Sequence, residues 1–165
     1  MSTSGKLRSM ATVYLTCGDQ ILLLYRQGSS VVADSWVGSA GGHFVPEELC
    51  DARVCVLREM REELGLEEAQ LGGLSLRYIV LRRAEKEIRQ NYYFFAELPG
   101  GTELSLYSTE GTLKWVSQSA LFNYEMPVTA KQMLEHWRGR GRYTNEVYGG
   151  VTDGKNGIFT EITLF

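Results

Sequence analysis

Two apolar runs near the start of the chain predict a β-hairpin. The segments Met10–Cys17 and Ile21–Tyr25 are rich in β-branched, aromatic and leucine residues. Gly18, Asp19 and Gln20 lie between them, and small or polar residues in such a position mark a turn between strands. The next stretch, residues 27–42, is rich in glycine and serine and lacks sustained periodicity. We therefore expect a long loop there.

Two helices are predicted from their composition and their end signals. The first runs from Asp51 to Leu64, where good helix formers precede Gly65, a residue suited to a left-handed cap. The second covers Val128–Trp137, because Pro127 suits the first turn of a helix and Gly139 lies just past the end.

Strands account for most of the remaining pattern. We predict three of them, at Leu74–Leu81, Ile88–Glu97 and Thr112–Val116, with the charged residues 82–87 as the tip between the first two. The glycine-rich residues 139–157 are expected to be loop, followed by a terminal strand at Ile158–Leu164. Short turns join several consecutive strands while helices interleave with them, so a mixed sheet covered by helices is expected. The fold class is α/β, an α/β sandwich.

Composition limits the classes of protein that the chain can belong to. Its 165 residues, 44% hydrophobic and 22% charged, are typical of one ordinary globular domain, so we expect residues 1–165 to form a single domain. A formal net charge of -3 provides no basic surface for a long nucleic acid. Residues 1–10 lack the apolar core of a signal peptide, and no run approaches membrane-spanning length. We expect a cytoplasmic protein without a membrane partner, whose oligomeric state the sequence does not give.

The cysteines suggest neither cross-links nor a zinc site. Cys17, Cys50 and Cys55 are odd in number and form no CxxC pair. Reduced thiols are therefore expected.

Three glutamates in the first predicted helix are the strongest chemical signal. Glu59, Glu62 and Glu63 stand at positions i, i+3 and i+4 and so share one face of the helix. Their mutual repulsion is relieved if a hard divalent cation lies among them, which favours Mg²⁺, with Mn²⁺ as the other candidate. An apolar stripe on another face would anchor the helix to the sheet, formed by Leu57, Met60 and Leu64. Taken alone, the same glutamates are equally typical of a solvated surface helix.

The surrounding residues decide between these two interpretations. Together with the helix they resemble the Nudix box of the MutT-like hydrolases, G-x5-E-x7-REUxEExGU, where U is apolar. Gly42 matches the box glycine and Glu48 the first glutamate; the helix half is matched by Arg58-Glu59, Met60, Glu62-Glu63 and Gly65-Leu66. There are two departures. Nine residues rather than seven separate Glu48 from Arg58, which leaves open whether Glu47 or Glu48 faces the metal. In addition, Ala40 stands where the family often has proline.

The resemblance implies a Nudix-type α/β/α sandwich with a mixed central sheet. It also implies a pyrophosphohydrolase that uses metal-activated water to cleave a small nucleotide, a nucleoside triphosphate or a related nucleoside diphosphate derivative. Catalytic roles would fall to Glu59 and Glu62, and Arg58 would hold Glu59 in position. The metal would be bound by residues of the box, namely Gly42, Glu48, Glu59, Glu62 and Glu63.

Three candidates lie outside the box. Glu110 precedes a predicted strand, in a loop where MutT-like proteins tend to carry a further catalytic carboxylate; the alternative is a solvated loop glutamate. Glu125 lies in a segment that resembles the one meeting the nucleobase in MutT-like enzymes, so it would read the edge of a purine, ordinary or oxidised. Its alternative is a helix N-terminal glutamate favoured by the macrodipole. Arg26, at the end of the predicted hairpin, is the other candidate substrate-binding residue.

Two other functions remain as alternatives. The first is a non-catalytic module that senses a nucleotide on the same scaffold, against which the intact Glu59, Glu62 and Glu63 count. The second is an isoprenoid diphosphate isomerase, which needs a catalytic thiol, and Cys55 is its only candidate.

Overall fold

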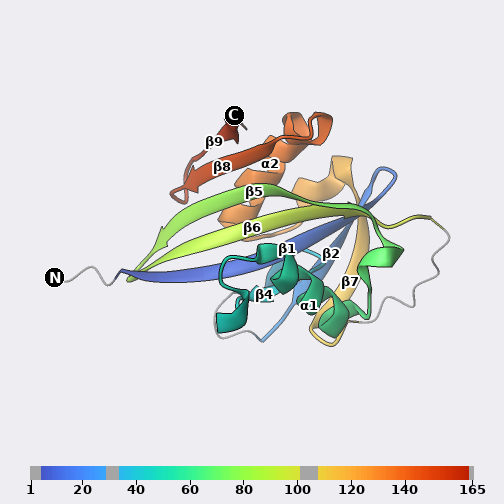
Figure 1. Ribbon diagram of the computed structural model, residues 1–165. Coiled ribbons are helices and arrows are strands. Elements are labelled where there is room, and N and C mark those ends of the chain that lie inside the picture. The colour runs from blue at the N-terminus through green and yellow to red at the C-terminus, as the bar shows by residue number, and fades with distance from the viewer. Residues whose placement is uncertain (1–4, 29–33, 101–107, 164–165) are drawn as a thin grey trace.

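The computed structural model describes residues 5–28, 34–100 and 108–163. Within this part of the chain, nine strands form one sheet (Figure 1). In chain order they are β1 Lys6–Cys17, β2 Gln20–Arg26, β3 Ser35–Val37, β4 Ala40–His43, β5 Gly72–Ala84, β6 Glu87–Glu97, β7 Gly111–Ser117, β8 Val147–Thr152 and β9 Gly157–Ile162.

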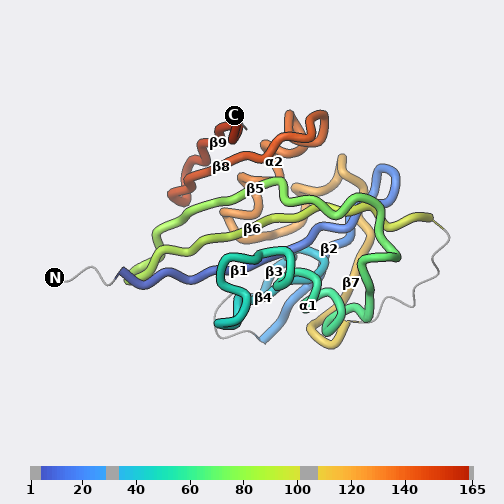
Figure 2. Tube along the Cα trace, in the orientation of Figure 1, coloured from blue at the N-terminus to red at the C-terminus, as the bar shows by residue number. Residues whose placement is uncertain are grey.

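The sheet is mixed, which confirms the α/β class expected from the sequence. Its order is β3-β2-β1-β6-β5-β8-β9, while β4 also pairs with β1 and β7 with β2. The pairs β1–β6 and β5–β8 are parallel, and the other pairs are antiparallel. The long strands β1, β5 and β6 run side by side toward one end of the molecule (Figure 2).

Two helices cover opposite faces of the sheet (Figure 1). Helix α1, Ala52–Leu64, packs on the face that carries Phe94, and α2, Val128–Gly139, packs on the face that carries Tyr93. Successive side chains of a strand point to opposite faces, so β6 contributes to both hydrophobic cores. The described residues also form four short 3-10 helices, namely η1 Pro46–Glu48, η2 Glu68–Gln70, η3 Gln118–Asn123 and η4 Gly141–Tyr143.

Helix α1 begins and ends where its capping residues predict. The Asp51 carboxylate accepts a hydrogen bond from the backbone N–H of Val54 at 3.1 Å, so Asp51 is the N-cap rather than the first helical residue. Gly65 ends the helix with φ 65°, in the left-handed region. The expected apolar stripe was partly wrong: Cys55, Val56 and Met60 are fully buried, while Leu57 and Leu64 are only partly buried. The helix is therefore rotated so that Glu63 also points inward.

Three expected loops contain strands. Strand β3 lies within residues 27–42 and pairs with β2, and β4 begins within this range, ends at His43 and pairs with β1. Both strands are too short for a hydrophobic period to reveal them. The charged residues 82–87 were expected to be a tip, but β5 continues to Ala84 and β6 begins at Glu87. Arg82 is therefore a strand residue, and its register partner is Arg89.

The glycine-rich tail contains β8, which was expected to be loop. Gly150 is required there because a Cβ would lie 2.5 Å from the ring of Phe159 on β9. The role of glycine at this position is to allow close packing of the strands, not to make the chain flexible. The buried Arg77 holds the preceding turn by donating hydrogen bonds to the carbonyls of Gly141, Thr144 and Glu146.

Neither helix of the described chain has the length and apolarity that a membrane-spanning helix needs.

Candidate active site

A glycine pair on β4 receives two carboxylates of α1. The backbone N–H of Gly41 donates a hydrogen bond to Oε2 of Glu63 at 3.2 Å. The carboxylate of Glu59 lies over Gly42, and a Cβ on residue 42 would overlap Glu59 Oε1. Only glycine leaves room for Glu59 in this position. The strand and the helix therefore fit together through these carboxylates.

Arg58 connects the glutamates of the box. Its Nη1 lies 2.8 Å from Glu59 Oε1 and 3.1 Å from Glu62 Oε2. Its Nη2 donates to the backbone carbonyl of His43 at 3.2 Å, which ties the helix to the end of β4. Nε and Nη2 also donate to the two carboxylate oxygens of Glu48, at 2.5 and 3.1 Å. This bidentate geometry fixes the guanidinium plane.

Glu48 and Glu47 have different environments. Glu48 is buried, with 3% of its surface exposed, and the hydrogen bonds from Arg58 lower the pKa of its carboxyl to about 2. Glu47 is exposed. In this structure Glu48 therefore faces inward and holds Arg58, although the sequence resemblance implied that it binds the metal.

Glu63 is buried and lies between groups of both signs. Burial is the main cause that raises the pKa of its carboxyl to about 7; the Gly41 N–H opposes the shift and the charge of Glu59 adds to it. Nη2 of Arg26 lies 3.8 Å from Glu63 Oε1 and 3.3 Å from Glu110 Oε2. Arg26 thus stands between two carboxylates, and it brings Glu110 from outside the box into the same cluster.

These residues fit a hard divalent cation. Glu59, Glu63 and Glu110 provide carboxylate oxygens, the kind of ligand that Mg²⁺ takes, and the Glu59 carboxylate occupies the space over Gly42. Among the residues that the structure describes, no group of three or more acidic, histidine or cysteine side chains is arranged so that it could hold a metal ion by itself. This is compatible with Mg²⁺, which is usually bound by one or two carboxylates together with water and substrate phosphates.

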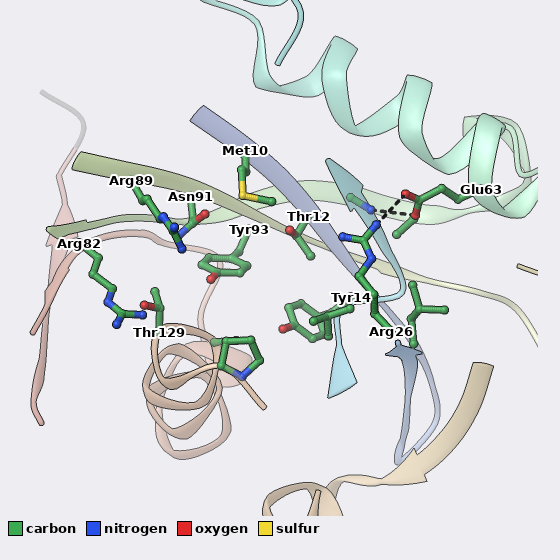
Figure 3. Close-up of a pocket in the computed structure, with 17 residues that line it drawn as sticks. Met10, Thr12, Tyr14, Arg26, Glu63, Arg82, Arg89, Asn91, Tyr93 and Thr129 are labelled. Atoms are coloured by element: carbon green, nitrogen blue, oxygen red, sulfur yellow. Dashed lines mark hydrogen bonds and ion pairs between the residues drawn. The ribbon is translucent and has the colours of Figure 1, made fainter. Parts of the chain in front are cut away.

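A pocket opens from the acidic cluster across the face of the sheet that α2 covers (Figure 3). Arg26, Gly41 and Glu63 line one end, and Arg82 and Arg89 line the other. The floor of the pocket between the two ends, which we call the bed, is formed by alternate residues of β1 and β6, namely Met10, Thr12, Tyr14, Asn91 and Tyr93. The start of α2 covers it with Pro127, Thr129 and Ala130.

Of the expected site residues, Arg26 and Glu63 line the pocket, whereas the others do not, namely Gly42, Glu48, Arg58, Glu59, Glu62, Glu110 and Glu125. The Glu125 side chain is exposed and does not line it, while the backbone carbonyl of Glu125 accepts a hydrogen bond from the Trp36 N–H at 2.9 Å. Glu62 lies at the rim next to Arg58, with 58% of its side chain exposed.

Cys55 has none of the properties of a nucleophile. It is fully buried, and burial raises the pKa of its thiol to about 12. Its Sγ lies 3.8 Å from the carbonyl of Gly42. This environment disfavours the isomerase alternative, which requires a reactive thiol.

The sequence interpretation missed most of the pocket. Arg89, Asn91 and Tyr93 alternate along β6 and so share one face, a pattern that mixes polar and aromatic residues where a core face would be apolar. That alternation was the available signal. Arg82 was missed for another reason, because a run of charges at 82–87 indicated a turn.

Comparison with known proteins was made by family, by sequence and by structure. The model of the NUDIX domain family matches residues 6–137. The search of curated proteins found no match.

Many solved structures are similar to this chain. A MutT protein from Bacillus halodurans is 21% identical with a TM-score of 0.64, covering 88% of this chain and 89% of its own. An Ap4A hydrolase from C. elegans is 18% identical with a TM-score of 0.64, covering 80% and 96%. A MutT protein from Methanosarcina mazei Go1 is 19% identical with a TM-score of 0.64, covering 87% and 100%. At these identities the similarity shows the fold.

Proposed function

The chain belongs to the NUDIX domain family and is a hydrolase, and we propose that it cleaves the diphosphate linkage of a small nucleotide with the help of Mg²⁺. The substrate class is a nucleoside triphosphate or a related nucleoside diphosphate derivative, and Mn²⁺ is the alternative ion. The observation that carries the proposal is the position of the acidic cluster. Its member Glu63 lines one end of a pocket that extends to Arg82, and Arg26 connects Glu63 to Glu110.

Some residues of the cluster would bind the cation, and others hold the binding residues in position. Glu59 and Glu63 would hold the cation from α1, and Glu110 would approach it from the loop before β7. A bound divalent ion neutralises diphosphate oxygens and lowers the pKa of a water molecule that attacks phosphorus. Arg58 keeps the Glu59 carboxylate over Gly42, and Glu48 keeps Arg58 in place.

Arg26 is suited to bind a phosphate of the substrate. Its guanidinium already reaches the edge of the acidic cluster, where it is within 4 Å of both Glu63 and Glu110. A cation bound by these carboxylates would replace the charge that Arg26 now supplies. The guanidinium would then be available for a phosphate oxygen, for which its planar donors are well suited.

The proposal is tested by measuring phosphate and diphosphate release from nucleoside triphosphates, nucleotide sugars, dinucleoside polyphosphates and ADP-ribose, with Mg²⁺ and with EDTA. We expect Mg²⁺-dependent release that Glu59→Gln reduces by at least about 100-fold, because loss of a ligand should exceed the effect of losing a supporting residue. Glu135→Gln, on the exposed side of α2, is the matched control and should be unchanged. Nucleotide binding without release from any compound would reject the hydrolase proposal and favour the sensing module.

A further inference from the structure

Two arginines face each other at the end of the pocket remote from the acidic cluster. Arg82 on β5 and Arg89 on β6 are register partners, and both line the pocket (Figure 3). Like charges placed directly opposite one another on neighbouring strands destabilise a sheet. An arrangement of this kind inside a pocket is explained if an anion binds between the two guanidinium groups.

The protein itself supplies too little negative charge at this end. Glu87 accepts a hydrogen bond from Nε of Arg89 at 3.0 Å, and it also lies 3.6 Å from Nη1 of Arg8. One carboxylate is thus shared by two arginines. The side chain of Arg82 forms no hydrogen bond or ion pair with any residue of the described ranges, so its guanidinium is available to a ligand.

The start of α2 adds backbone donors to the same end. The first N–H groups of a helix lack intrahelical acceptors, and Pro127 at the N-cap provides no side-chain acceptor for them. Thr129 and Ala130, in this first turn, are buried and line the pocket. Thr152 connects the helix to the arginines, because it pairs with Arg82 and its hydroxyl lies 3.3 Å from that of Thr129. An uncapped helix start favours anions.

The two ends of the pocket are separated by about the length of a nucleoside. Along β1, Thr12 pairs with Gly41 beside Glu63, and Arg8 pairs with Arg89. Four residues of strand separate these positions, a length of roughly 13 Å. The bed in between, with Met10, Asn91 and Tyr93, combines apolar, amide and aromatic surface.

We propose that Arg82, Arg89 and the first turn of α2 form a second phosphate subsite. The preferred substrate then carries, besides the diphosphate that is cleaved, a separate phosphate on the far side of its nucleoside. This inference rests on the proposed function for the orientation of the substrate.

The test is a comparison of compounds that differ only in such a phosphate. Coenzyme A is paired with its 3′-dephospho form, and ADP-ribose 2′-phosphate with ADP-ribose. Binding is measured by calorimetry in EDTA, which prevents hydrolysis. We expect the wild-type protein to bind the phosphorylated member of at least one pair about tenfold more tightly, as hydrogen bonds to a charged group predict.

Variants assign that preference to the arginines. Arg82→Gln should bring the affinity ratio within the pair close to one, and it should fold normally because Arg82 has no partner among the described residues to lose. Arg83→Gln is the matched control: Arg83 is exposed, points to the other face of the sheet and should leave the ratio unchanged.

Three results would overturn the inference. They are equal affinities within both pairs for the wild-type protein, a phosphate preference that survives in Arg82→Gln, and a loss of the phosphate preference in the control Arg83→Gln as large as the loss in Arg82→Gln. Hydrolysis of the same compounds with Mg²⁺ is measured separately. A phosphate preference without hydrolysis would reject only the proposed function, and hydrolysis without the preference would reject only the second subsite.

Discussion

Gly42 is the residue at which a single added carbon should matter most. In Gly42→Ala the new Cβ would occupy the position of Glu59 Oε1, so the Glu59 side chain must move. That carboxylate is the end of a flexible side chain, and we therefore expect Mg²⁺-dependent turnover to fall by about 10- to 100-fold while the melting temperature changes little. Gly139→Ala is the control, because a Cβ there meets no atom within 4 Å. Equal turnover in both variants would show that Glu59 does not need its place over Gly42.

Substitutions of Glu48 and Glu47 test whether Glu48 supports Arg58 or binds the metal. Glu48→Gln removes the charge that pairs with Arg58, and we expect the free energy of unfolding in EDTA to fall by about 1.5–3 kcal/mol. Glu47→Gln should have no effect, since Glu47 is exposed. Denaturant titration measures both. If Glu48 served only as a metal ligand, its neutralisation without metal would leave stability unchanged or raise it.

The sequence was informative about residues whose partners are close along the helix, and much less about the others. Glu59, Glu62 and Glu63 were found because helical spacing alone places them on one face. The contact between Glu48 and Arg58 depends on how residues 43–51 fold back on the helix, which spacing does not reveal. Met10, Asn91 and Arg82 meet only through strand pairing, so a single sequence could not bring them together.

The C-terminal elements hold a histidine that should make stability depend on pH. His136 on α2 lies 2.8 Å from the Tyr78 hydroxyl and packs on Tyr148, and burial lowers the pKa of its imidazole, with the charge of Arg140 acting in the same direction. The neutral form is thus favoured in the folded state. Its contribution to stability is present above the ordinary histidine pKa of about 6.5 and is lost as the pH falls through the lowered value.

The measurement compares unfolding of the wild-type protein and His136→Gln across this range. We expect the wild-type free energy of unfolding to fall more steeply than that of the variant as the pH drops below about 6.5. His43, whose pKa is also lowered by burial, is present in both proteins and cancels in the comparison. Parallel curves would contradict the assignment to His136.

Among the elements, those with strong end signals were predicted best. Helix α1 has Asp51 and Gly65 at its ends, and the β1–β2 hairpin has Gly18 at its turn. Strand β8 was missed because its glycines serve close packing against β9, which is a tertiary requirement with the local appearance of a loop. The extension of β5 beyond Leu81 was missed because pairing with β6 overrides the turn preference of charged residues.

The whole molecule places opposite charges at the two ends of one pocket. The chain has a formal net charge of -3, yet the pocket runs from Glu63, at the edge of the acidic cluster, to Arg82 and Arg89. Helices α1 and α2 lie on opposite sides of the sheet (Figure 1). Glu63 of α1 and Thr129 and Ala130 of α2 all line the pocket. This polarity suits a substrate that meets a cation at one end and arginines at the other.

The central claim, that the carboxylates at the Gly41–Gly42 pair bind a divalent cation, is tested most directly by titrating the protein with Mn²⁺ and following free Mn²⁺ by electron paramagnetic resonance. We predict saturable binding by the wild-type protein and by Glu135→Gln, weakened by about tenfold or more in Glu63→Gln. Unchanged Mn²⁺ affinity in a folded Glu63→Gln variant would contradict the claim.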